Sequence, residues 1–331
     1  MDPLTQGTIG AVLPQSLSKK RSIVWATIVG FLAGMAPDLD IFIRSETDPL
    51  LFLEYHRQFT HSLVFIPVGG SVCAGVLHFI IGRARGVPFF QTWLFCLLGY
   101  GTHALLDACT TYGTVLLWPF SNERFAWNVI SIIDPLFTLP ILLAVVLGML
   151  RRRFTYARLG CLWAMVYLTV GIWQHGSAVD MGRSIAIKRG HEPVRLDAKP
   201  SFANILVWKT VYESEGRYFV DAVRVGFQPR VFEGESISKL DIERDFSWLD
   251  KYSQQYKDVE RFRWFSRGYL AKDPEFPDRI IDIRYSLVPN EIRSIWSIQL
   301  TRDHQERHVA YLTHRQFVGR SKRRLWEILS D

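Results

Sequence analysis

The sequence predicts an α-helical polytopic membrane domain of about five transmembrane helices, followed by a mixed α+β soluble domain. Two observations support this division. Of the charged residues, 12 Lys and Arg and 9 Asp and Glu precede residue 176, whereas 27 and 23 follow it. The sparsely charged first half also contains five apolar stretches of roughly 20 residues, the length that crosses a bilayer core as a helix. We therefore predict a membrane domain over 1–175 and a soluble domain over 176–331.

The predicted spans are apolar stretches with few charges. They cover residues 22–43, 61–82, 89–109, 129–150 and 156–174. The segment Met1–Ser18 is shorter and less apolar, so we expect it to form an interfacial or re-entrant helix. This organisation excludes a disordered chain, a collagen-like chain and a single soluble domain.

The basic residues of the short loops predict the orientation, because Lys and Arg are enriched on the cytoplasmic side of a membrane. Alternation through five spans places nine of them on one side: Lys19, Lys20, Arg21, Arg83, Arg85, Arg151, Arg152, Arg153 and Arg158. Only Arg44, Arg57 and Arg124 lie on the other side. We therefore expect a cytoplasmic N-terminus, with the loops 44–60 and 110–128 and the whole soluble domain facing the extracytoplasmic side.

The soluble half is expected to contain strand pairs and a helix. Stretches rich in β-branched and aromatic residues predict two pairs, 205–212 with 218–227 and 279–288 with 294–301. The polar residues 213–217 suit a hairpin turn inside the first pair. Between the pairs, residues 246–265 have the apolar spacing of a helix.

The informative residues of the first half are polar groups that a membrane should exclude. An Asp near the centre of a transmembrane helix costs about 2.5–3.5 kcal/mol on insertion scales. Such residues nevertheless occur in or beside four spans: Asp38, Asp40, His56, His61, His103, Asp107 and Asp134. On the predicted topology they share one leaflet, although the charge count that gave the topology did not require it. The sequence therefore predicts one polar cluster near the extracytoplasmic surface.

The spacing of these residues suits metal binding. His103 and Asp107 are four residues apart, so they project from one face of a helix. His56 and His61 can converge only if a helix starts between them, and Thr60 is a candidate N-cap for that start. The two aspartates at 38 and 40 follow a proline and are expected to converge from a non-helical turn that lines a polar cavity.

Mixed His and carboxylate ligands suit a divalent metal, with Zn²⁺ preferred and Mn²⁺ as the alternative. The predicted ligands are Asp38, Asp40, His56, His61, His103 and Asp107. Six ligands exceed one tetrahedral site, so we expect more than one ion.

Four segments together resemble a known family: residues 1–7 (MDPLTQG), 37–40 (PDLD), 56–62 (HRQFTHS) and 102–107 (THALLD). They are similar to the YdjM-type bacterial inner-membrane proteins, which are described as metal-dependent hydrolases. The likeness covers about residues 1–150 and implies a bacterial inner-membrane protein of a longer subgroup that carries a C-terminal soluble domain. The family's distant similarity to zinc phospholipase C and nuclease P1 implies a phosphoester substrate. Many members carry His where this chain has Gln6, so an N-terminal ligand is left open.

Two functions are compatible with these residues. The first is a membrane-embedded metal-dependent hydrolase in which Asp40 or Asp107 acts as general base. Arg57 would then contact a phosphate or pair with an Asp, and the position at the membrane edge favours a lipid or lipid-linked substrate. The second is a non-catalytic metal-binding scaffold whose soluble domain recognises a partner.

Other assignments are less specific. Asp134 is either a further ligand or the start of a helix, because Ile133-Asp134-Pro135 also suits an N-cap. His78 lies near the other end of its span and is expected to be structural. No motif indicates nucleic-acid binding, and the oligomeric state is left open. We expect the soluble domain to pack over the loops 44–60 and 110–128 and to supply no metal ligand.

Overall fold

The structure, a computed structural model, describes residues 1–314 and 319–330. Its internal contacts divide the chain into two units, which we call the helical unit and the β unit. The helical unit contains Met1–Phe42, Tyr55–Ile172 and Phe202–Asn204. The β unit contains Ile43–Glu54, Trp173–Ser201 and Ile205–Asp331. A short segment that connects two parts of the helical unit in sequence therefore belongs to the β unit.

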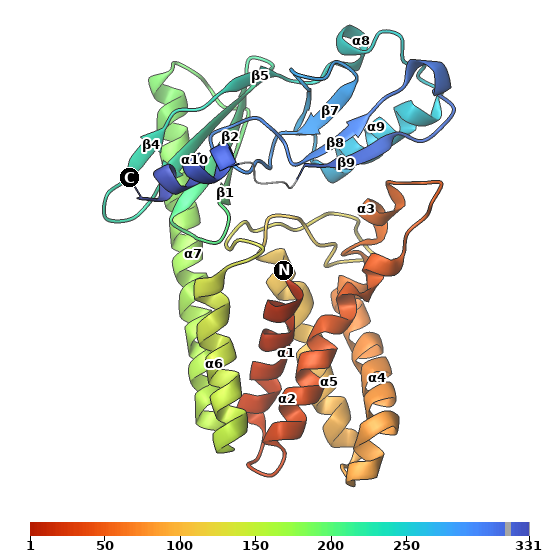
Figure 1. The fold of residues 1–331 in the computed structure, drawn as a ribbon, viewed down its shortest axis with the longest axis vertical. Helices are drawn as coiled ribbons and strands as arrows, with labels where there is room; N and C mark the ends of the chain where they lie inside the picture. Colours follow the sequence, from red (N-terminus) through yellow and green to blue (C-terminus); the bar gives the residue numbers. More distant parts are fainter. Residues whose placement is uncertain (315–318, 331) are drawn as a thin grey trace. The chain divides into compact units, whose positions relative to one another are not determined.

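The helical unit is a bundle whose helices lie side by side (Figure 1). They are α1 (Pro3–Leu17), α2 (Ile23–Met35), α4 (Ile66–Leu77), α5 (Phe89–Ala108), α6 (Pro135–Arg151) and the first part of α7 (Phe154–Lys188). A 3-10 helix over Ala36–Phe42 continues α2, and a π-helical turn followed by a 3-10 turn continues α4 to Arg85.

Three helical stretches of the described chain are long and apolar enough to cross a membrane: Ile23–Phe42, Leu63–Arg85 and Phe154–Lys188. They coincide with the first, second and fifth predicted spans. Helix α6 is apolar but shorter, and the predicted span over 89–109 is the 20-residue helix α5, which is not among the three. The structure thus supports an apolar helical region followed by a β-sheet unit, while the number of five spans stays a prediction.

Helix α1 is a buried part of the bundle, which corrects the interfacial or re-entrant helix predicted for Met1–Ser18. It packs against α2, α5 and α6, and ten of its 15 residues are buried. Asp2 caps its first turn by accepting a hydrogen bond from the Thr5 amide at 3.1 Å. The small residues that lower its hydropathy are packing residues, because a Cβ on Gly10 would lie 2.5 Å from the Gly30 carbonyl oxygen.

The direction of α1 brings the N-terminus and the polar cluster to the same end of the helical unit. Gln15, near the end of α1, donates to Thr27, near the start of α2, so the two consecutive helices run antiparallel. Met1 therefore lies where α2 ends, and its backbone nitrogen donates to the Asp107 carboxylate. A cytoplasmic N-terminus and an extracytoplasmic polar cluster cannot both be correct, since Met1 and the cluster share one end of the bundle. The prediction failed because α1 was not counted as a helix of the bundle.

The β unit contains two antiparallel sheets (Figure 1). The first has the order β1 (Arg195–Pro200), β2 (Val207–Ser214), β3 (Arg217–Arg224) and β4 (Arg230–Phe232), with β5 (Ser236–Ser238) also paired to β3. The second has the order β6 (Leu270–Lys272), β7 (Arg279–Asp282), β8 (Trp296–Gln299) and β9 (Ala310–Thr313). The helices of this unit are α8 (Ile242–Asp245), α9 (Gln254–Phe265), α10 (Gly319–Ser330) and the end of α7.

Both predicted strand pairs are confirmed, with β2 shifted by two residues and β3, β7 and β8 shorter than predicted. β2 pairs with β3 through a two-residue turn, Glu215-Gly216, in which both residues have positive φ, as a type I′ hairpin requires. β7 pairs with β8. The predicted helix over 246–265 begins later than expected, at Gln254, where the Ser253 side chain caps it by accepting from the Tyr256 amide.

The segment Ile43–Glu54 is held within the β unit by Arg261 of α9. The Arg261 guanidinium bonds both carboxylate oxygens of Asp48, at 2.9 and 2.8 Å, and one oxygen of Glu54 at 2.5 Å. It also bonds Asp258, three residues earlier on α9, at 2.9 Å. Bidentate pairs between Arg and carboxylate fix geometry as well as charge. We call these four residues the Arg261 clamp.

Candidate metal centre

Four side chains converge at the end of the bundle where α2 and α5 end. Asp38 comes from the 3-10 helix that continues α2, and His61 from a 3-10 turn before α4. His103 and Asp107 come from the last two turns of α5. One ligand atom from each lies within 4.8 Å of the others, and the last three residues are fully buried. We call this group the His/Asp cluster.

The distances in the His/Asp cluster match a tetrahedral metal site. The Nε2 atoms of His61 and His103 are 2.9 Å apart. Asp38 Oδ1 lies 3.5 and 3.4 Å from these two nitrogens, and Asp107 Oδ2 lies 3.3 and 3.7 Å from them. A tetrahedral ion with bonds of about 2.0–2.1 Å places its ligand atoms about 3.3 Å apart. Two imidazoles and two carboxylates therefore already stand at the spacing that a single ion requires.

The hydrogen bonds of the two histidines assign their tautomers. His103 Nδ1 lies 2.6 Å from the Gly34 carbonyl oxygen, which can only accept, so Nδ1 carries the proton. His61 Nδ1 lies 3.2 Å from Asp40 Oδ2, which makes it the donor to that carboxylate. In the neutral rings both Nε2 lone pairs then face each other across 2.9 Å. This contact is repulsive unless a cation lies between them, as a metal ion would.

Asp40 holds the histidines in place. Its Oδ1 lies 2.7 Å from His56 Nδ1, and its Oδ2 accepts from the Arg57 amide at 2.9 Å and from the Thr60 hydroxyl at 2.8 Å. Together with the contact to His61, Asp40 would form the carboxylate–histidine–metal arrangement that orients ligands in many metal proteins if an ion were bound at His61. Asp38, Asp40 and His56 also form a second group whose ligand atoms lie within 4.8 Å of one another.

Arg57 brings a positive charge to the cluster. Its Nε lies 2.9 Å from Asp107 Oδ2, and its terminal nitrogen donates to Thr110 at 3.0 Å. The guanidinium also lies over the Tyr112 ring, 4.8 Å from its centre. Arg57 has a φ of 63°, a left-handed conformation that is strained for a residue with a side chain. This strained turn separates His56 from His61, where the sequence predicted a helix start.

Two local predictions were wrong. Thr60 does not cap a helix, since its hydroxyl donates to Asp40 and the Ser62 side chain accepts from the Phe65 amide instead. The aspartates at 38 and 40 lie in a 3-10 helix, where a non-helical turn was expected. A 3-10 helix keeps most backbone groups hydrogen-bonded, which suits an apolar environment better than an irregular turn.

Gln6 belongs to the surroundings of the cluster, a role that sequence reasoning left open. It is fully buried, and its Nε2 donates to Asp107 Oδ1 at 2.6 Å. Among the described residues its Oε1 has no hydrogen-bond partner, whereas Asp107 Oδ2 forms an ion pair with Arg57. Acceptor oxygens that are buried without donors are costly and fit a bound cation. The signal in the sequence was a run of polar residues, Thr5 to Thr8, at the start of an otherwise apolar helix.

Asp134 and His78 lie outside both groups of ligand atoms. Asp134 caps α6, accepting from the Phe137 amide at 3.2 Å and from the Tyr167 hydroxyl at 2.8 Å. Asp134 is thus the start of a helix, which was one of its two predicted roles. His78 opens the π-helical turn after α4, and its ring packs edge-on against Phe89.

Comparison with known proteins identifies the family to which the N-terminal part of the chain is similar. Residues 1–178 match a protein family described as YdjM inner membrane protein. The chain is also similar to Inner membrane protein YbcI of Escherichia coli (strain K12), with 36% identity over 107 residues. That alignment covers 31% of this chain and 60% of the relative's length. No solved structure matches the chain.

Proposed function

Since the chain belongs to the YdjM family and is a bacterial inner-membrane protein, we propose that it is a membrane-embedded metal-dependent hydrolase. The observation that supports this best is the His/Asp cluster. Its four ligand atoms, from Asp38, His61, His103 and Asp107, have tetrahedral spacing before any ion is considered. Two of its members are imidazoles whose Nδ1 atoms contact the Gly34 carbonyl oxygen, for His103, and the Asp40 carboxylate, for His61.

The donor set favours Zn²⁺, with Mn²⁺ as the alternative, because two imidazole nitrogens and two carboxylate oxygens suit both ions and tetrahedral spacing suits zinc. The second group, Asp38 with Asp40 and His56, shares one carboxylate with the first. A carboxylate shared by two groups is the arrangement of a two-metal site, so we propose room for two ions.

The bound metal would polarise the scissile bond and activate a water molecule near neutral pH. The protein's own groups would divide the remaining work. Asp40 already engages four donors, so it is suited to holding His56 and His61. Asp107 is therefore the better candidate for a general base, in which case its Oδ2 would accept the proton of the water and the other three ligand atoms of the cluster would hold the ion. Arg57 lies beside that oxygen and would neutralise an anionic substrate group.

The substrate class follows from the surroundings of the cluster. A guanidinium beside the metal ligands suits the negative charge of a phosphoester. On the same 3-10 helix as Asp38, the side chains of Leu39 and Phe42 are 62% and 78% exposed. Large exposed apolar side chains beside a polar site suit contact with lipid. We therefore propose a phosphoester that is part of a lipid or is linked to one.

We place the site on the extracytoplasmic side. With α1 counted as a helix of the bundle, the basic residues at 19–21, 83–85 and 151–158 gather at the end opposite to the cluster. The basic residues at the cluster end include Arg57 and Arg124, which are buried among polar partners. Loop cations are enriched on the cytoplasmic side, so the cluster end, with Met1, would face outward.

The proposal is tested by metal content and turnover in the same preparations. Purified protein should contain a divalent metal by elemental analysis and hydrolyse members of a lipid phosphoester panel. His61→Ala and Asp107→Ala should lose both properties, whereas His78→Ala, a matched histidine outside the cluster, should keep both. Equal metal content in all variants would contradict the shared site. Bound metal without turnover of any phosphoester would favour the scaffold function.

A further inference from the structure

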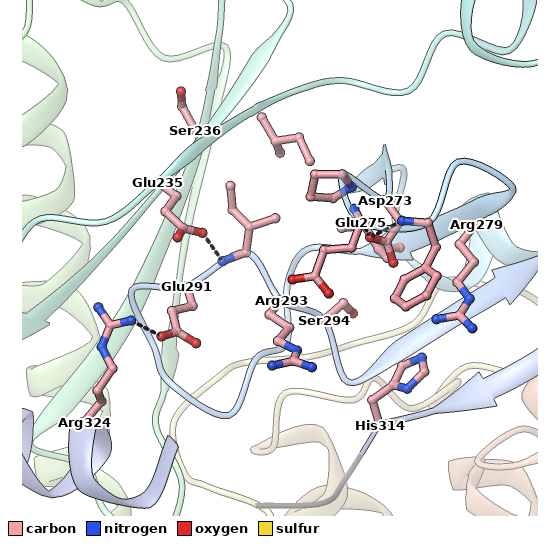
Figure 2. Close-up of a pocket in the computed structure, with 15 residues that line it drawn as sticks. Glu235, Ser236, Asp273, Glu275, Arg279, Glu291, Arg293, Ser294, His314 and Arg324 are labelled. Carbon is pink, nitrogen blue, oxygen red and sulfur yellow. Dashed lines mark hydrogen bonds and ion pairs between the residues drawn. The ribbon is translucent and has the colours of Figure 1, made fainter. Parts of the chain in front are cut away.

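The β unit contains a cavity of about 620 Å³ that is separate from the His/Asp cluster. It is bounded by β5, the β6–β7 loop, β7, the loop before β8, and α10. Figure 2 shows charged side chains of both signs around it. Its volume lies in the range of natural small-molecule sites, which is about 300–1,000 Å³. A ligand can pair only with the charged side chains of the cavity that the protein itself does not already pair.

Most acidic groups of this cavity are already satisfied. Glu235 accepts from the Ile292 amide at 3.0 Å, and Glu291 pairs with Arg324 at 2.5 Å (Figure 2). Asp273 accepts from two backbone amides of its own loop, at 2.9 and 3.3 Å. Carboxylates that accept such bonds are poor sites for an additional cation. Glu275 lies in an exposed loop position and is the acidic lining residue that remains.

Two basic groups of the cavity remain uncommitted. Arg279 and Arg293 have no carboxylate within 4 Å among the residues that the structure describes, although both line the cavity. The Arg279 guanidinium lies 3.8 Å from the centre of the Phe276 ring, which fixes its plane. Its Nε is buried and has no described acceptor. A buried cationic donor without an acceptor is costly, so this atom points to a missing anionic partner.

A third basic side chain reaches the same space. His314 lines the cavity beside the two arginines, and its Nε2 contacts the Ser297 hydroxyl at 3.1 Å. Burial and the charges of Arg279 and Arg293 lower the pKa of His314, against the opposing effect of Asp273. The field at the imidazole is thus shaped by both guanidiniums. Apolar lining is supplied by Phe276, Ile281 and Ile292.

We propose that this cavity binds a small organic anion, with Arg279 and Arg293 holding its carboxylate or phosphoryl oxygens and Phe276 and the isoleucines contacting its apolar part. Arginine suits planar, bidentate recognition of both oxygen groups. The cavity is far larger than an inorganic anion needs, so the ligand carries an organic portion. This proposal does not depend on the hydrolase function of the metal centre.

Isothermal titration calorimetry of the full chain in neutral detergent tests the proposal. Phenylphosphonate and phenylacetate serve as probes, with benzamide as the uncharged control. All titrations contain a chelator and use the His61→Ala background, so that neither probe can bind through a metal ion. At least one anionic probe should bind saturably and benzamide should not. The two anionic arms distinguish a phosphoryl ligand from a carboxyl ligand.

Substitutions then locate the binding. Arg293→Gln, at an exposed position, and Arg279→Gln should each weaken binding of the anion by about tenfold or more. Arg307→Gln, an exposed arginine outside the cavity, should leave it unchanged. Binding that survives Arg293→Gln and Arg279→Gln at full strength would overturn the proposal, as would the absence of saturable binding by both anions. Arg293→Gln keeps the test decisive if Arg279→Gln fails to fold.

Discussion

Asp40 and Asp107 are buried carboxylates in different positions: Asp40 contacts Nδ1 of His61 and is suited to orienting the ring, whereas Asp107 supplies an atom of the His/Asp cluster. Two imidazoles and two aspartates near the ends of apolar helices are costly enough to stand out in a sequence. Asp38, His61, His103 and Asp107 were grouped for that reason, and the structure brings their ligand atoms together. The same signal cannot separate a ligand from the residue that orients it, because both are carboxylates at similar depth.

Replacing Asp40 by Asn tests its orienting role. Asn keeps the size of the side chain but removes the charge that fixes the His61 tautomer. Loss of such a supporting carboxylate typically costs 10–100-fold in metal affinity. We expect Asp40→Asn to weaken metal binding at the His/Asp cluster by about this factor in competition with a chromogenic chelator, and to remove the second ion, for which Asp40 is a proposed ligand.

The control for this prediction is Asp134→Asn. Asp134 is another buried aspartate of the helical unit, and Asn remains an effective helix cap there. Its metal affinity should equal that of the unsubstituted protein. Unchanged metal affinity and content in Asp40→Asn would contradict both the orienting role and the proposed second ion.

Helix α1 was predicted as a helix, but its burial inside the bundle was not, because it contains many small and polar residues. Mean hydropathy measures transfer into lipid, whereas α1 is buried among other helices, so a low value does not argue against burial. The sequence did predict the apolar helices α2, α4 and α7 and the strand pairs, since those depend on long apolar runs and on alternation. The role of Gln6 could not be predicted for a similar reason, because an amide side chain in the first turn of a helix often has only a structural role.

Close packing of α1 on α2 makes Gly30 sensitive to substitution. A Cβ on Gly30 would lie 2.5 Å from both the Gly10 carbonyl oxygen and the Pro14 ring. The backbones would have to separate, at a cost of about 1–3 kcal/mol or more. Gly30→Ala should therefore lower the melting temperature of the detergent-solubilised protein by several degrees.

Gly75→Ala is the matched control for this prediction. Gly75 lies in α4, and a Cβ there meets nothing within 4 Å. Alanine is the better helix former by about 0.5–1 kcal/mol, so Gly75→Ala should melt at the same temperature or higher. Equal melting temperatures for Gly30→Ala and Gly75→Ala would show that α1 does not pack as described.

The Arg261 clamp predicts local opening of the segment Ile43–Glu54. Arg261→Gln would remove the cation that joins Asp258 of α9 to Asp48 and Glu54. Hydrogen exchange over 43–54 should then become faster by about tenfold or more, corresponding to the 1–3 kcal/mol of a charged hydrogen bond. Arg263→Gln, two residues away with a solvent-exposed pair to Glu260, should leave that exchange unchanged.

The orientation of the molecule is testable by labelling. In a background with the four native cysteines replaced, Leu4→Cys and Lys19→Cys place thiols at exposed positions near opposite ends of α1. A membrane-impermeant maleimide added to intact spheroplasts should label the cysteine at position 4 and not the one at position 19. Labelling of position 19 alone would place the metal centre on the cytoplasmic side and would contradict the proposed orientation.

The membership of Ile43–Glu54 in the β unit means that this chain is not a simple tandem of two modules. Residues 1–178 carry the family match, yet Asp48 within them is bonded to Arg261, 213 residues later in sequence. Removal of the residues after 178 would therefore leave Asp48 and Glu54 without the guanidinium that binds them. The loop between Asp40 and His56 is thus expected to need the C-terminal part of the chain in order to keep its conformation, although it lies inside the part that matches the family.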